Sequence, residues 1–542
     1  MMKRTMTLML CAVLTLFATA QNINKDTRAR WLEVAEKSKP TLHYRTVRPV
    51  ALVRAVSDSS AYQGWRYEKV GEPAELYTAN FNQMREVTLD FGQHFVGYFT
   101  FHVRELTNCQ DAPIRLKFTF GEVPAELNVP LDPWRAGLNR AWMQDEVVTV
   151  TSVGEPITIP RRIAFRYLKI ELMGHSSWDF AIDEMSFRAQ SSAGEVLTKL
   201  EPTCPEMVRR INEVGIETLR ECMQTVYEDG PKRDRRLWVG DMYLESLANR
   251  YSFRNHLMTK RCLYLFAALS TEDGVVISNC FEEPRPHAQD VSICLTYSLL
   301  WNSSLLEYLI DTDDRETAND LFPLAIRQAK AALAFVGDDG IFDRARCPLW
   351  LFFDWRDGLD VATPMQGATI FALQQTYELA QRLGREDEVK EYPALIRKMK
   401  AAARKQLYNA KRGVAESGPD RQVSVLGQTW LIKSGVLTKK EGARAIRTAL
   451  AMDNCVMPGT PYGTHYLIDA MLLCDMKEEA RAYLVDYWGG MVRKGADTYW
   501  EAYDPNDDFI CPYGYHPVNS SCHAWGCTPV YFIHQYPEVF QR

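Results

Sequence analysis

Beyond its first twenty residues, the sequence has no uninterrupted apolar run close to the roughly 18 residues that a membrane-spanning helix requires. We therefore expect no membrane insertion. The sequence also lacks an excess of basic residues, because its formal net charge is −6. This charge gives no electrostatic reason to expect nucleic acid or anionic lipid as a partner.

The sequence shows no pattern that would hold a metal ion. It contains 13 cysteines, but it has no Cys-x-x-Cys pair and no Cys/His cluster with the spacing of a zinc site. We expect neither a metal nor a cofactor. Many of the cysteines lie in apolar helical patterns, where a free thiol behaves as a small hydrophobe, so their disulfide pairing stays open. No internal repeat and no low-complexity segment is found.

The N-terminus has the features of an export signal. Lys3 and Arg4 form a short positive segment, residues 6–17 are an apolar run, and residues 18–20 (Ala-Thr-Ala) fit the small-residue rule for cleavage. We predict that residues 1–20 are a signal peptide and that Gln21 becomes the new N-terminus. The protein is then expected to be soluble and exported, in the periplasm or outside the cell.

The first half of the mature chain carries strand signals. Runs rich in Val, Ile, Thr and aromatic residues follow one another without a helical pattern between them, at residues 86–92, 97–103, 114–119, 146–151 and 166–172. This succession favours an antiparallel β-sandwich. A mature chain of about 520 residues is long enough for two or three domains, and we assign residues 21–192 to the β-sandwich domain.

The second half of the chain shows helical spacing of its apolar residues. We expect helices near 207–223, 241–254, 256–269, 288–310, 315–336, 365–383, 389–402, 438–451, 464–474 and 476–489. Alternately short and long connections indicate repeated helical hairpins, and a ring of hairpins closes into an α/α barrel with its active site among the loops at one end. The predicted fold is multidomain β + α, with the barrel over residues 193–542.

Residues 229–241, with the sequence DGPKRDRRLWVGD, place three carboxylates and four cations in thirteen residues. Gly and Pro open the stretch and Trp-Val-Gly closes it, which indicates a shaped loop. Its acids are Asp229, Asp234 and Asp241, and Arg233 is one of the interleaved cations. Such a mixture can also be an ion-pair network that only holds a loop in place.

A second carboxylate-rich stretch, residues 495–504 (GADTYWEAYD), strengthens the functional interpretation. It places Trp500 and Glu501 between two tyrosines, so that aromatic rings frame a carboxylate. A glycosidase could use two such stretches, because one acid must protonate the leaving oxygen while a second group handles water or the anomeric carbon. Apolar walls would raise the pKa of one acid and leave its solvated partner ionised.

Two further stretches could contact a ligand. Residues 521–525 (SCHAW) contain His523 and Trp525, and His523 could bind a substrate hydroxyl, orient a carboxylate or be a packed core histidine. Residues 351–357 (LFFDWRD) place Asp354 and Trp355 on a loop before the 365–383 helix, where helix capping is the alternative role.

Together these stretches resemble motifs of the α-L-rhamnosidases of glycoside hydrolase family 78. The loop 229–241 resembles the family signature D-x-P-x-R-D-E-R-L-G-W-T-G-D, residues 495–504 resemble its A-T-T-x-W-E-R-W segment, and residues 521–532 resemble its terminal S-x-x-H-A-W/F segment. Residues 90–98 and 258–274 resemble the start of its β-sandwich and the helix after its signature. The likeness spans about residues 45–542 and implies a six-hairpin (α/α)6 barrel.

The resemblance implies roles for individual residues. Glu501 occupies the slot of the general base that activates water, and Asp229 and Asp241 match the aspartates that would grip sugar hydroxyls. The family inverts the anomeric centre, which implies carboxyl groups roughly 6.5–9.5 Å apart. The other residues expected to contact the sugar are Arg233, Trp238, Asp354, Trp355, Trp500, His523 and Trp525.

The signature loop departs from the family pattern at the general acid. The loop is one residue shorter than the signature, whose acid is the Glu of Asp-Glu-Arg. Depending on where the gap falls, either Arg235 or Asp234 takes that slot, and an arginine could not donate the proton. We expect Asp234 to be the acid, with Asp229 or Asp241 as the candidates if the loop does not present it.

The preferred hypothesis is an exported, inverting exo-glycoside hydrolase that removes terminal α-L-rhamnose, or a closely related sugar, from a polysaccharide or oligosaccharide. One alternative is a polysaccharide lyase on an α/α barrel, with Tyr or His as base and Arg233 or Arg235 neutralising the uronate. The other alternative is a non-catalytic glycan-binding relative. The oligomeric state is left open.

Overall fold

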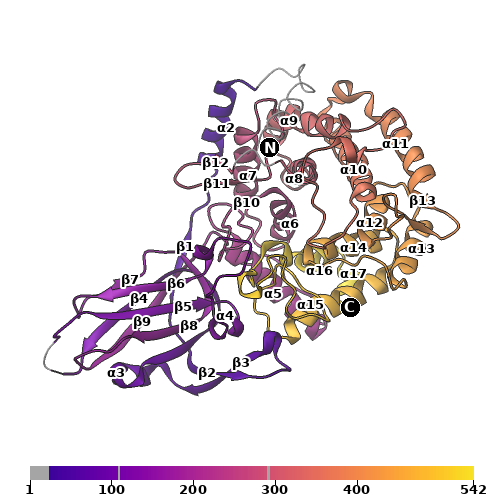
Figure 1. Cartoon of the computed structure of the whole chain (residues 1–542). Helices are drawn as coiled ribbons and strands as arrows, with labels where there is room; N and C mark the ends of the chain where they lie inside the picture. Colours follow the sequence, from indigo (N-terminus) through magenta and orange to yellow (C-terminus); the bar gives the residue numbers. More distant parts are fainter. Residues whose placement is uncertain (1–22, 108–109, 290–292) are drawn as a thin grey trace, which may run out of the picture. The chain divides into compact units, whose positions relative to one another are not determined.

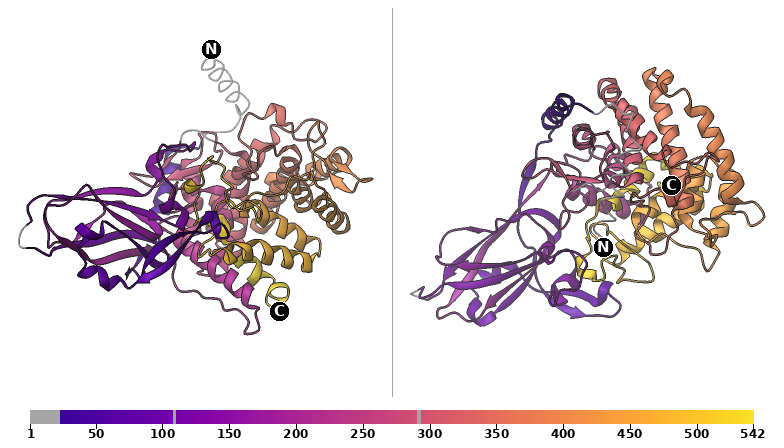
Figure 2. Two further views of the ribbon diagram at one scale, coloured as in Figure 1. Left: turned by 60° about the horizontal axis from the view of Figure 1, so that its bottom comes forward. Right: turned by 45° about the horizontal axis from the view of Figure 1, so that its top comes forward.

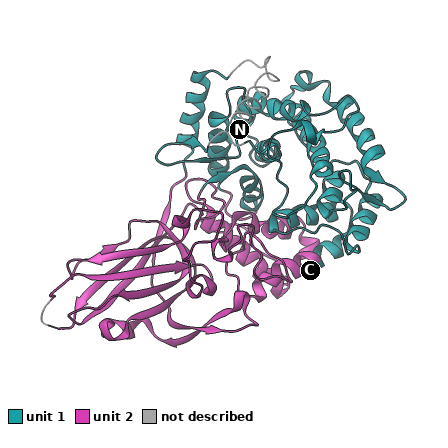
Figure 3. Cartoon of the chain, viewed as in Figure 1, with its two compact units in different colours: residues 1–39, 236–250, 255–482 teal, residues 40–235, 251–254, 483–542 magenta. Residues whose placement is uncertain are grey.

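The computed structural model describes residues 23–107, 110–289 and 293–542, so the predicted signal peptide lies outside the described residues. The chain divides into two compact units (Figure 3). Unit 1 consists of residues 1–39, 236–250 and 255–482, and unit 2 consists of residues 40–235, 251–254 and 483–542. Because each unit combines several stretches, the predicted domain boundaries at residues 20/21 and 192/193 stay a prediction.

Unit 2 contains a nine-stranded antiparallel sheet with the order β1-β9-β4-β8-β5-β6, to which β2, β3 and β7 are attached (Figure 1). The first part of β4 pairs with β2 and β8, and its last part pairs with β7 and β9. The strands are β1 (His43–Val47), β2 (Ala51–Ser57), β3 (Trp65–Gly71), β4 (Glu86–Glu105), β5 (Ile114–Gly121), β6 (Asp145–Val150), β7 (Ile157–Thr158), β8 (Ile163–Met173) and β9 (Phe180–Ser191).

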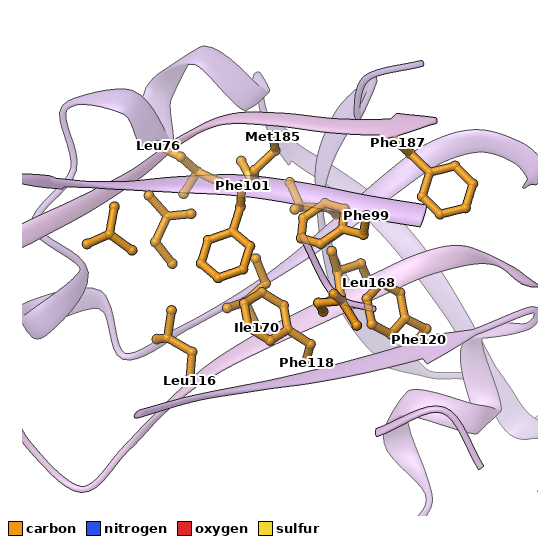
Figure 4. Packing of buried hydrophobic residues seen from close by; sticks show 14 of the residues in the cluster. Leu76, Phe99, Phe101, Leu116, Phe118, Phe120, Leu168, Ile170, Met185 and Phe187 are labelled. Atoms are coloured by element: carbon orange, nitrogen blue, oxygen red, sulfur yellow. The ribbon is translucent and has the colours of Figure 1, made fainter. Parts of the chain in front are cut away.

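The core of this sheet domain follows from alternation along its strands. In β4, Phe99, Phe101 and Val103 are almost fully buried, whereas Thr100 and His102 between them are only partly buried. A strand sends successive side chains to opposite faces, so this period of two places the phenylalanines on one face. They pack against aromatic and aliphatic side chains of β5 and β8, as Figure 4 shows for Phe118, Phe120, Leu168 and Ile170.

Unit 1 is helical, and Figures 1 and 2 show its helices following one another around a curve. The even-numbered helices from α6 to α14 are consecutive neighbours, and the odd-numbered ones pack against them. The helices are α2 (Lys25–Lys37), α6 (Val239–Arg250), α7 (His256–Leu269), α8 (Leu295–Thr312), α9 (Arg315–Leu333), α10 (Ala362–Leu383), α11 (Tyr392–Leu407), α12 (Val425–Lys433), α13 (Lys439–Leu450) and α14 (Pro461–Leu473).

The two sets of helices differ in burial as an α/α barrel requires. Every residue from 425 to 432 in α12 is buried, whereas only Tyr392, Met399 and Ala403 are buried in α11. A helix that is covered on all sides is apolar all round, and a peripheral helix shows one apolar stripe. Unit 1 also contains the short strands β10 (Leu237–Trp238), β11 (Asn279–Phe281), β12 (His287–Ala288), β13 (Tyr408–Asn409) and β14 (Val414–Ala415).

The remaining helices belong wholly or partly to unit 2. They are α3 (Phe81–Met84), α4 (Pro124–Asn128), α5 (Glu206–Cys222), α16 (Pro529–Gln535) and α17 (Pro537–Phe540), and α15 (Lys477–Arg493) begins in unit 1 and ends in unit 2. Helix α5 packs against α16 and against the 3₁₀ helix η7 (Ala524–Cys527). Among the described residues, no helix is both long and apolar enough to cross a membrane.

The predicted fold class, an N-terminal antiparallel β domain followed by a six-hairpin helical barrel, is confirmed, with corrections in detail. The structure adds α2, α12 and the short helices α3, α4, α16 and α17, which the periodicity did not predict. The helix expected at 288–310 begins only at Leu295, and the helix expected at 241–254 ends at Arg250. The two strands expected at 86–92 and 97–103 are a single strand, β4.

Candidate active site

Three stretches that are far apart in the sequence meet in unit 2. The backbone N–H of Glu501 donates to Ser520 O at 2.9 Å, and the N–H of His523 donates to Tyr499 O at 2.8 Å. The N–H of Ala524 donates to Asp229 O at 2.8 Å. These backbone hydrogen bonds place the charged loop, the Trp-Glu segment and the Ser-Cys-His-Ala-Trp segment side by side.

The charged loop has an unusual backbone. Asp234 and Arg235 both have positive φ, at 58° and 52°. Two consecutive left-handed residues outside glycine are uncommon, and each such conformation stores on the order of 1–3 kcal/mol of strain that the surroundings must hold. A side chain at Gly230 would begin 2.9 Å from Ser520 Oγ, so a glycine lets the loop approach the 517–525 segment closely.

Glu501 is held from several sides. Its side chain is only 2% exposed. Tyr513 donates its hydroxyl to Oε1 at 2.6 Å, the N–H of Ser520 donates to Oε2 at 3.2 Å, and the guanidinium of Arg233 also donates to Oε2. Trp525 Nε1 donates to the backbone carbonyl of Glu501 at 2.9 Å. The position and rotamer of this carboxylate are therefore tightly defined.

Arg233 links the two predicted catalytic acids. One terminal nitrogen of its guanidinium binds Glu501, and the other lies 3.6 Å from Asp234 Oδ1. Its Nε donates to Val518 O at 2.8 Å, and its charged group lies 4.4 Å from the centre of the Tyr513 ring. The span of one guanidinium puts the two carboxyl groups on the order of 5–8 Å apart, a range that overlaps the separation of an inverting pair.

The two acids lie in different environments. Burial by itself raises the pKa of Glu501, but the charge of Arg233, the proximity of His523 and the Tyr513 hydrogen bond outweigh burial, so the net pKa lies below its ordinary value. The Glu501 carboxylate is thus ionised at neutral pH. The Asp234 side chain is 16% exposed, against 2% for Glu501, and it is the more accessible of the two.

Arg235, the alternative occupant of the acid slot, makes different contacts. Its guanidinium lies 3.5 Å from Gln144 Oε1, in the sheet domain of unit 2. Asp234 instead contacts Arg233, the residue that binds Glu501. Of the two residues, Asp234 shares a contact with the predicted base.

His523 and Trp525 form a close pair of tilted rings beside Glu501. Their ring centres are 4.0 Å apart, and His523 is buried. Burial lowers the pKa of His523 to about 4, so the imidazole is neutral at neutral pH. Trp500 is also buried and stacks on Tyr62 of the sheet domain with ring centres 3.8 Å apart. The roles of these three side chains in sugar binding stay predictions.

The other four predicted residues lie in unit 1. Trp238 ends β10, and Asp241 is in the first turn of α6, where a negative charge is favourable. Burial raises the pKa of Tyr462 well above its ordinary value, and the charge of Asp241 acts in the same direction. Trp238 belongs to an aromatic cluster in which neighbouring ring centres are 4.9–6.2 Å apart; it contains Trp238, Tyr297, Trp350, Phe352, Trp355 and Tyr462.

Asp354 holds two loops of unit 1 together. Thr460 donates its hydroxyl to Oδ1 at 2.6 Å, and the N–H of Gly459 donates to Oδ2 at 2.7 Å. Burial raises the pKa of Asp354 to about 6, although both hydrogen bonds act against the rise. Gly463 lets the first turn of α14 approach this carboxylate closely, because a side chain at Gly463 would begin 2.5 Å from Asp354 Oδ2. A sugar contact by Asp354 and Trp355 stays a prediction.

Several residues around the site were not predicted from the sequence. Tyr513 lies in the segment CPYGY, which carries no charged group and matches no motif considered above. Ser520 acts through its backbone N–H, which leaves no sequence signal. The unit 1 cluster adds Tyr297, Trp350, Phe352 and Tyr462 to the predicted tryptophans, and only the high aromatic content pointed to them.

The described residues are 23–107, 110–289 and 293–542. Within these ranges, no group of three or more His, Cys, Asp or Glu side chains could hold a metal ion. Most of the cysteines at these positions are buried. The thiols of Cys222 and Cys522 lie 3.9 Å apart in the interior of unit 2.

Comparisons with known proteins identify the two parts of the chain. Residues 49–189 match the glycosyl hydrolase family 78 alpha-rhamnosidase N-terminal domain, and residues 202–536 match the bacterial alpha-L-rhamnosidase 6 hairpin glycosidase domain. A comparison with curated proteins gave no match.

Solved structures give the same result. A rhamnosidase from Klebsiella oxytoca with rhamnose bound is 37% identical, with a TM-score of 0.90 over 94% of this chain and 99% of that chain. A family 78 rhamnosidase from Bacillus sp. GL1 is 19% identical, with a TM-score of 0.70 over 86% of this chain and 49% of that one, and supports the fold alone. These matches set aside the lyase and non-catalytic alternatives, and the chain belongs to glycoside hydrolase family 78, the family of the bacterial α-L-rhamnosidases.

Proposed function

We propose that the protein is an exported, inverting exo-α-L-rhamnosidase in which Glu501 is the general base and Asp234 is the general acid. The single observation that supports this assignment is the contact of both carboxylates with one guanidinium, that of Arg233. Arg233 and Glu501 are 268 positions apart in the sequence, so the contact brings distant parts of the chain to one small region of unit 2. The rhamnose in the Klebsiella oxytoca structure supports a carbohydrate substrate of this type.

Glu501 has the properties of a base that activates water. Its pKa lies below the ordinary value, so the carboxylate is ready to accept a proton at neutral pH. A carboxylate has about four acceptor sites, and three hydrogen bonds are seen, from Tyr513, Ser520 and Arg233. One acceptor site is left for a water molecule. The held position of the carboxylate reduces the entropy cost of aligning that water.

Asp234 supplies the proton for the leaving group. In the reaction, the water oxygen forms a bond to the anomeric carbon while Glu501 takes a proton from the water. The bond from the anomeric carbon to the glycosidic oxygen breaks, and that oxygen receives the proton of Asp234. One face of the sugar is attacked as the other loses its substituent, so the α-linked substrate releases β-L-rhamnose.

The stereochemistry of the first product tests the mechanism. We expect proton NMR of a fast hydrolysis of an aryl α-L-rhamnoside to show β-L-rhamnose before mutarotation sets in. An α product at early times would require a retaining mechanism, in which a carboxylate attacks the anomeric carbon, and would refute this assignment. Release of free rhamnose without shorter oligosaccharides would support exo action.

The general acid can be identified because the loss of activity on its replacement depends on the leaving group. We expect Asp234→Asn to lose about 10²–10⁴-fold of kcat/KM on alkyl rhamnosides but far less on a dinitrophenyl rhamnoside, whose leaving group needs no proton. Glu501→Gln should lose activity on both substrates. Asp229→Asn is the matched control in the same loop. If it shows the leaving-group dependence and Asp234→Asn does not, Asp229 is the acid.

The export proposal rests on residues 1–20 of the sequence and has its own test. The full-length gene product should be recovered outside the cytoplasm with Gln21 at its N-terminus, as measured by mass spectrometry. An uncleaved protein that stays in the cytoplasm would refute export without affecting the enzymatic proposal.

A further inference from the structure

Lys232, in the charged loop next to Arg233, is buried although it is a lysine. Its side chain is 1% exposed. The ammonium lies 3.1 Å from Glu122 Oε2 and 3.0 Å from Glu126 Oε1. It also donates to the backbone carbonyl of Pro517, at 3.4 Å, and to that of Asn519. A lysine is almost never fully buried unless it is paired, and here every donor has an acceptor.

The two glutamates come from the N-terminal sheet domain. Glu122 directly follows β5, and Glu126 lies in α4. Glu122 has further partners, because Oε2 accepts from the N–H of Ser521 at 2.5 Å and Oε1 lies 3.1 Å from His94 Nε2. The sheet domain therefore reaches both the charged loop and the segment 517–521 through one buried carboxylate.

In this cluster each buried charge lies in direct contact with a group of opposite charge. Burial raises the pKa of Glu122, but Lys232 and His94 overcome that effect and lower it to about 2. Burial raises the pKa of Glu126 to about 7, with the charge of Glu122 adding to the rise and Lys232 opposing it. Replacement of such a cluster by apolar side chains is often neutral for stability, so stability alone does not explain it.

The segment 517–521 connects the cluster with the proposed catalytic pair. Its carbonyls at Pro517 and Asn519 accept from Lys232, and the Ser521 N–H binds Glu122. Between these contacts, Val518 O accepts from Arg233 Nε at 2.8 Å, and the Ser520 N–H donates to Glu501 Oε2 at 3.2 Å. Consecutive backbone groups thus alternate between the two sets of charges.

We infer that Lys232, Glu122 and Glu126 form a positioning cluster, by which the N-terminal sheet domain sets the place of the segment 517–521 and, through it, the geometry of Arg233 and Glu501. The inference rests on the proposed function, in which Glu501 is the base. No member of the cluster contacts the Glu501 carboxylate in this structure. Lys232 and Glu122 contact the backbone of the segment, and Glu126 contacts Lys232.

The test compares Lys232→Met with a matched control, Lys169→Met. Lys169, on β8, also lies between two glutamates, at 3.1 Å from Glu86 and 3.4 Å from Glu171. It is partly exposed and contacts neither the charged loop nor the segment 517–521. For Lys232→Met we expect kcat on an aryl α-L-rhamnoside to fall about 100-fold, as for a misplacement of about 1 Å, with KM within about twofold. Lys169→Met should keep both constants.

The pH profile of kcat/KM distinguishes a positioning role of Lys232 from a purely structural role. When the segment shifts, Arg233 and the Ser520 N–H hold the Glu501 carboxylate less well, so its pKa rises. The acidic limb of kcat/KM in Lys232→Met should then move up by about one pH unit. A variant that is only less stable would keep the wild-type limb when it is assayed below its melting temperature.

A second variant covers the case in which Lys232→Met does not fold. Lys232→Met combined with Glu126→Gln leaves Glu122 paired with His94, so no unpaired charge is buried, while the lysine contacts with the segment are still lost. It should show the same fall in kcat and the same shift of the acidic limb. A folded variant with wild-type kcat and limb overturns the inference. Absence of rhamnosidase activity in the wild type would instead overturn the proposed function.

Discussion

Tyr513 offers a direct test of how Glu501 is controlled. Its hydroxyl donates to Glu501 Oε1 at 2.6 Å, while its ring lies under the guanidinium of Arg233 with 4.4 Å between the charged carbon and the ring centre. Tyr513→Phe removes the hydrogen bond and keeps the ring. The substitution therefore isolates one of the contacts that hold the pKa of Glu501 below its ordinary value.

The size of the effect follows from the strength of the lost bond. A hydrogen bond to a charged acceptor contributes about 1.5–3 kcal/mol, and one pKa unit corresponds to about 1.36 kcal/mol. The lower end of this range raises the pKa of Glu501 by about one unit in Tyr513→Phe. Because the base works as the carboxylate, activity at low pH should fall, and the acidic limb of kcat/KM should move up by about one pH unit.

The same bond also affects the free energy of unfolding. The pKa of Glu501 is lower in the folded protein than its ordinary value, so its ionisation stabilises the fold above that ordinary value, and this contribution is lost as the pH falls through the folded pKa. Tyr513→Phe should therefore lower the free energy of unfolding by about 1.5 kcal/mol at neutral pH. The difference from wild type should shrink in acid.

The assay is the pH dependence of kcat/KM on an aryl α-L-rhamnoside, together with urea unfolding at two pH values. Tyr515→Phe is the matched control, because Tyr515 lies in the same segment and donates its hydroxyl to Pro130 O instead of to Glu501. If the limb stays in place in Tyr513→Phe, or moves equally in Tyr515→Phe, Tyr513 does not control the base.

Two further predictions concern unit 1. Burial raises the pKa of Asp354 to about 6, so the wild type loses stability as the pH rises from the ordinary pKa of an aspartate to about 6. Relative to wild type, Asp354→Asn should gain up to about 3 kcal/mol of stability between about pH 3 and pH 7 in urea unfolding, and an unchanged difference would count against the raised pKa. A side chain at Gly240 would begin 2.4 Å from the ring of Tyr297, so Gly240→Ala should lower the free energy of unfolding by about 1–3 kcal/mol. Gly137 has open space around it, and Gly137→Ala should change the free energy of unfolding little. Equal changes in the two variants would refute the packing argument.

Periodicity predicted some helices closely and missed others. The helix expected at 256–269 is found as α7 with the same limits. Helix α12 has buried residues on every side, including the polar Gln428 and Thr429, so its apolar residues show no helical period. Its existence follows from the helices α10, α13 and α14 that pack around it.

A glycine misled the strand prediction for a physical reason. Gly92 and Gly97 read as turn residues, and the expected strands therefore ended at Gly92 and began at Gly97. In the structure, a side chain at Gly97 would begin 2.0 Å from Arg188 O. The glycine allows β9 to approach β4 closely, and β4 continues through this position.

For this protein, the residue types and their order along the chain were enough to predict the β domain, the helical barrel, the family and the acids Asp234 and Glu501 as candidates. Only the tertiary structure decided that one guanidinium contacts both acids, that Tyr513 and a backbone N–H hold the base, and that Arg235 contacts Gln144 instead. The reason is that local pattern reports which groups are available, whereas the pKa and geometry of a carboxylate depend on partners that folding brings from hundreds of residues away.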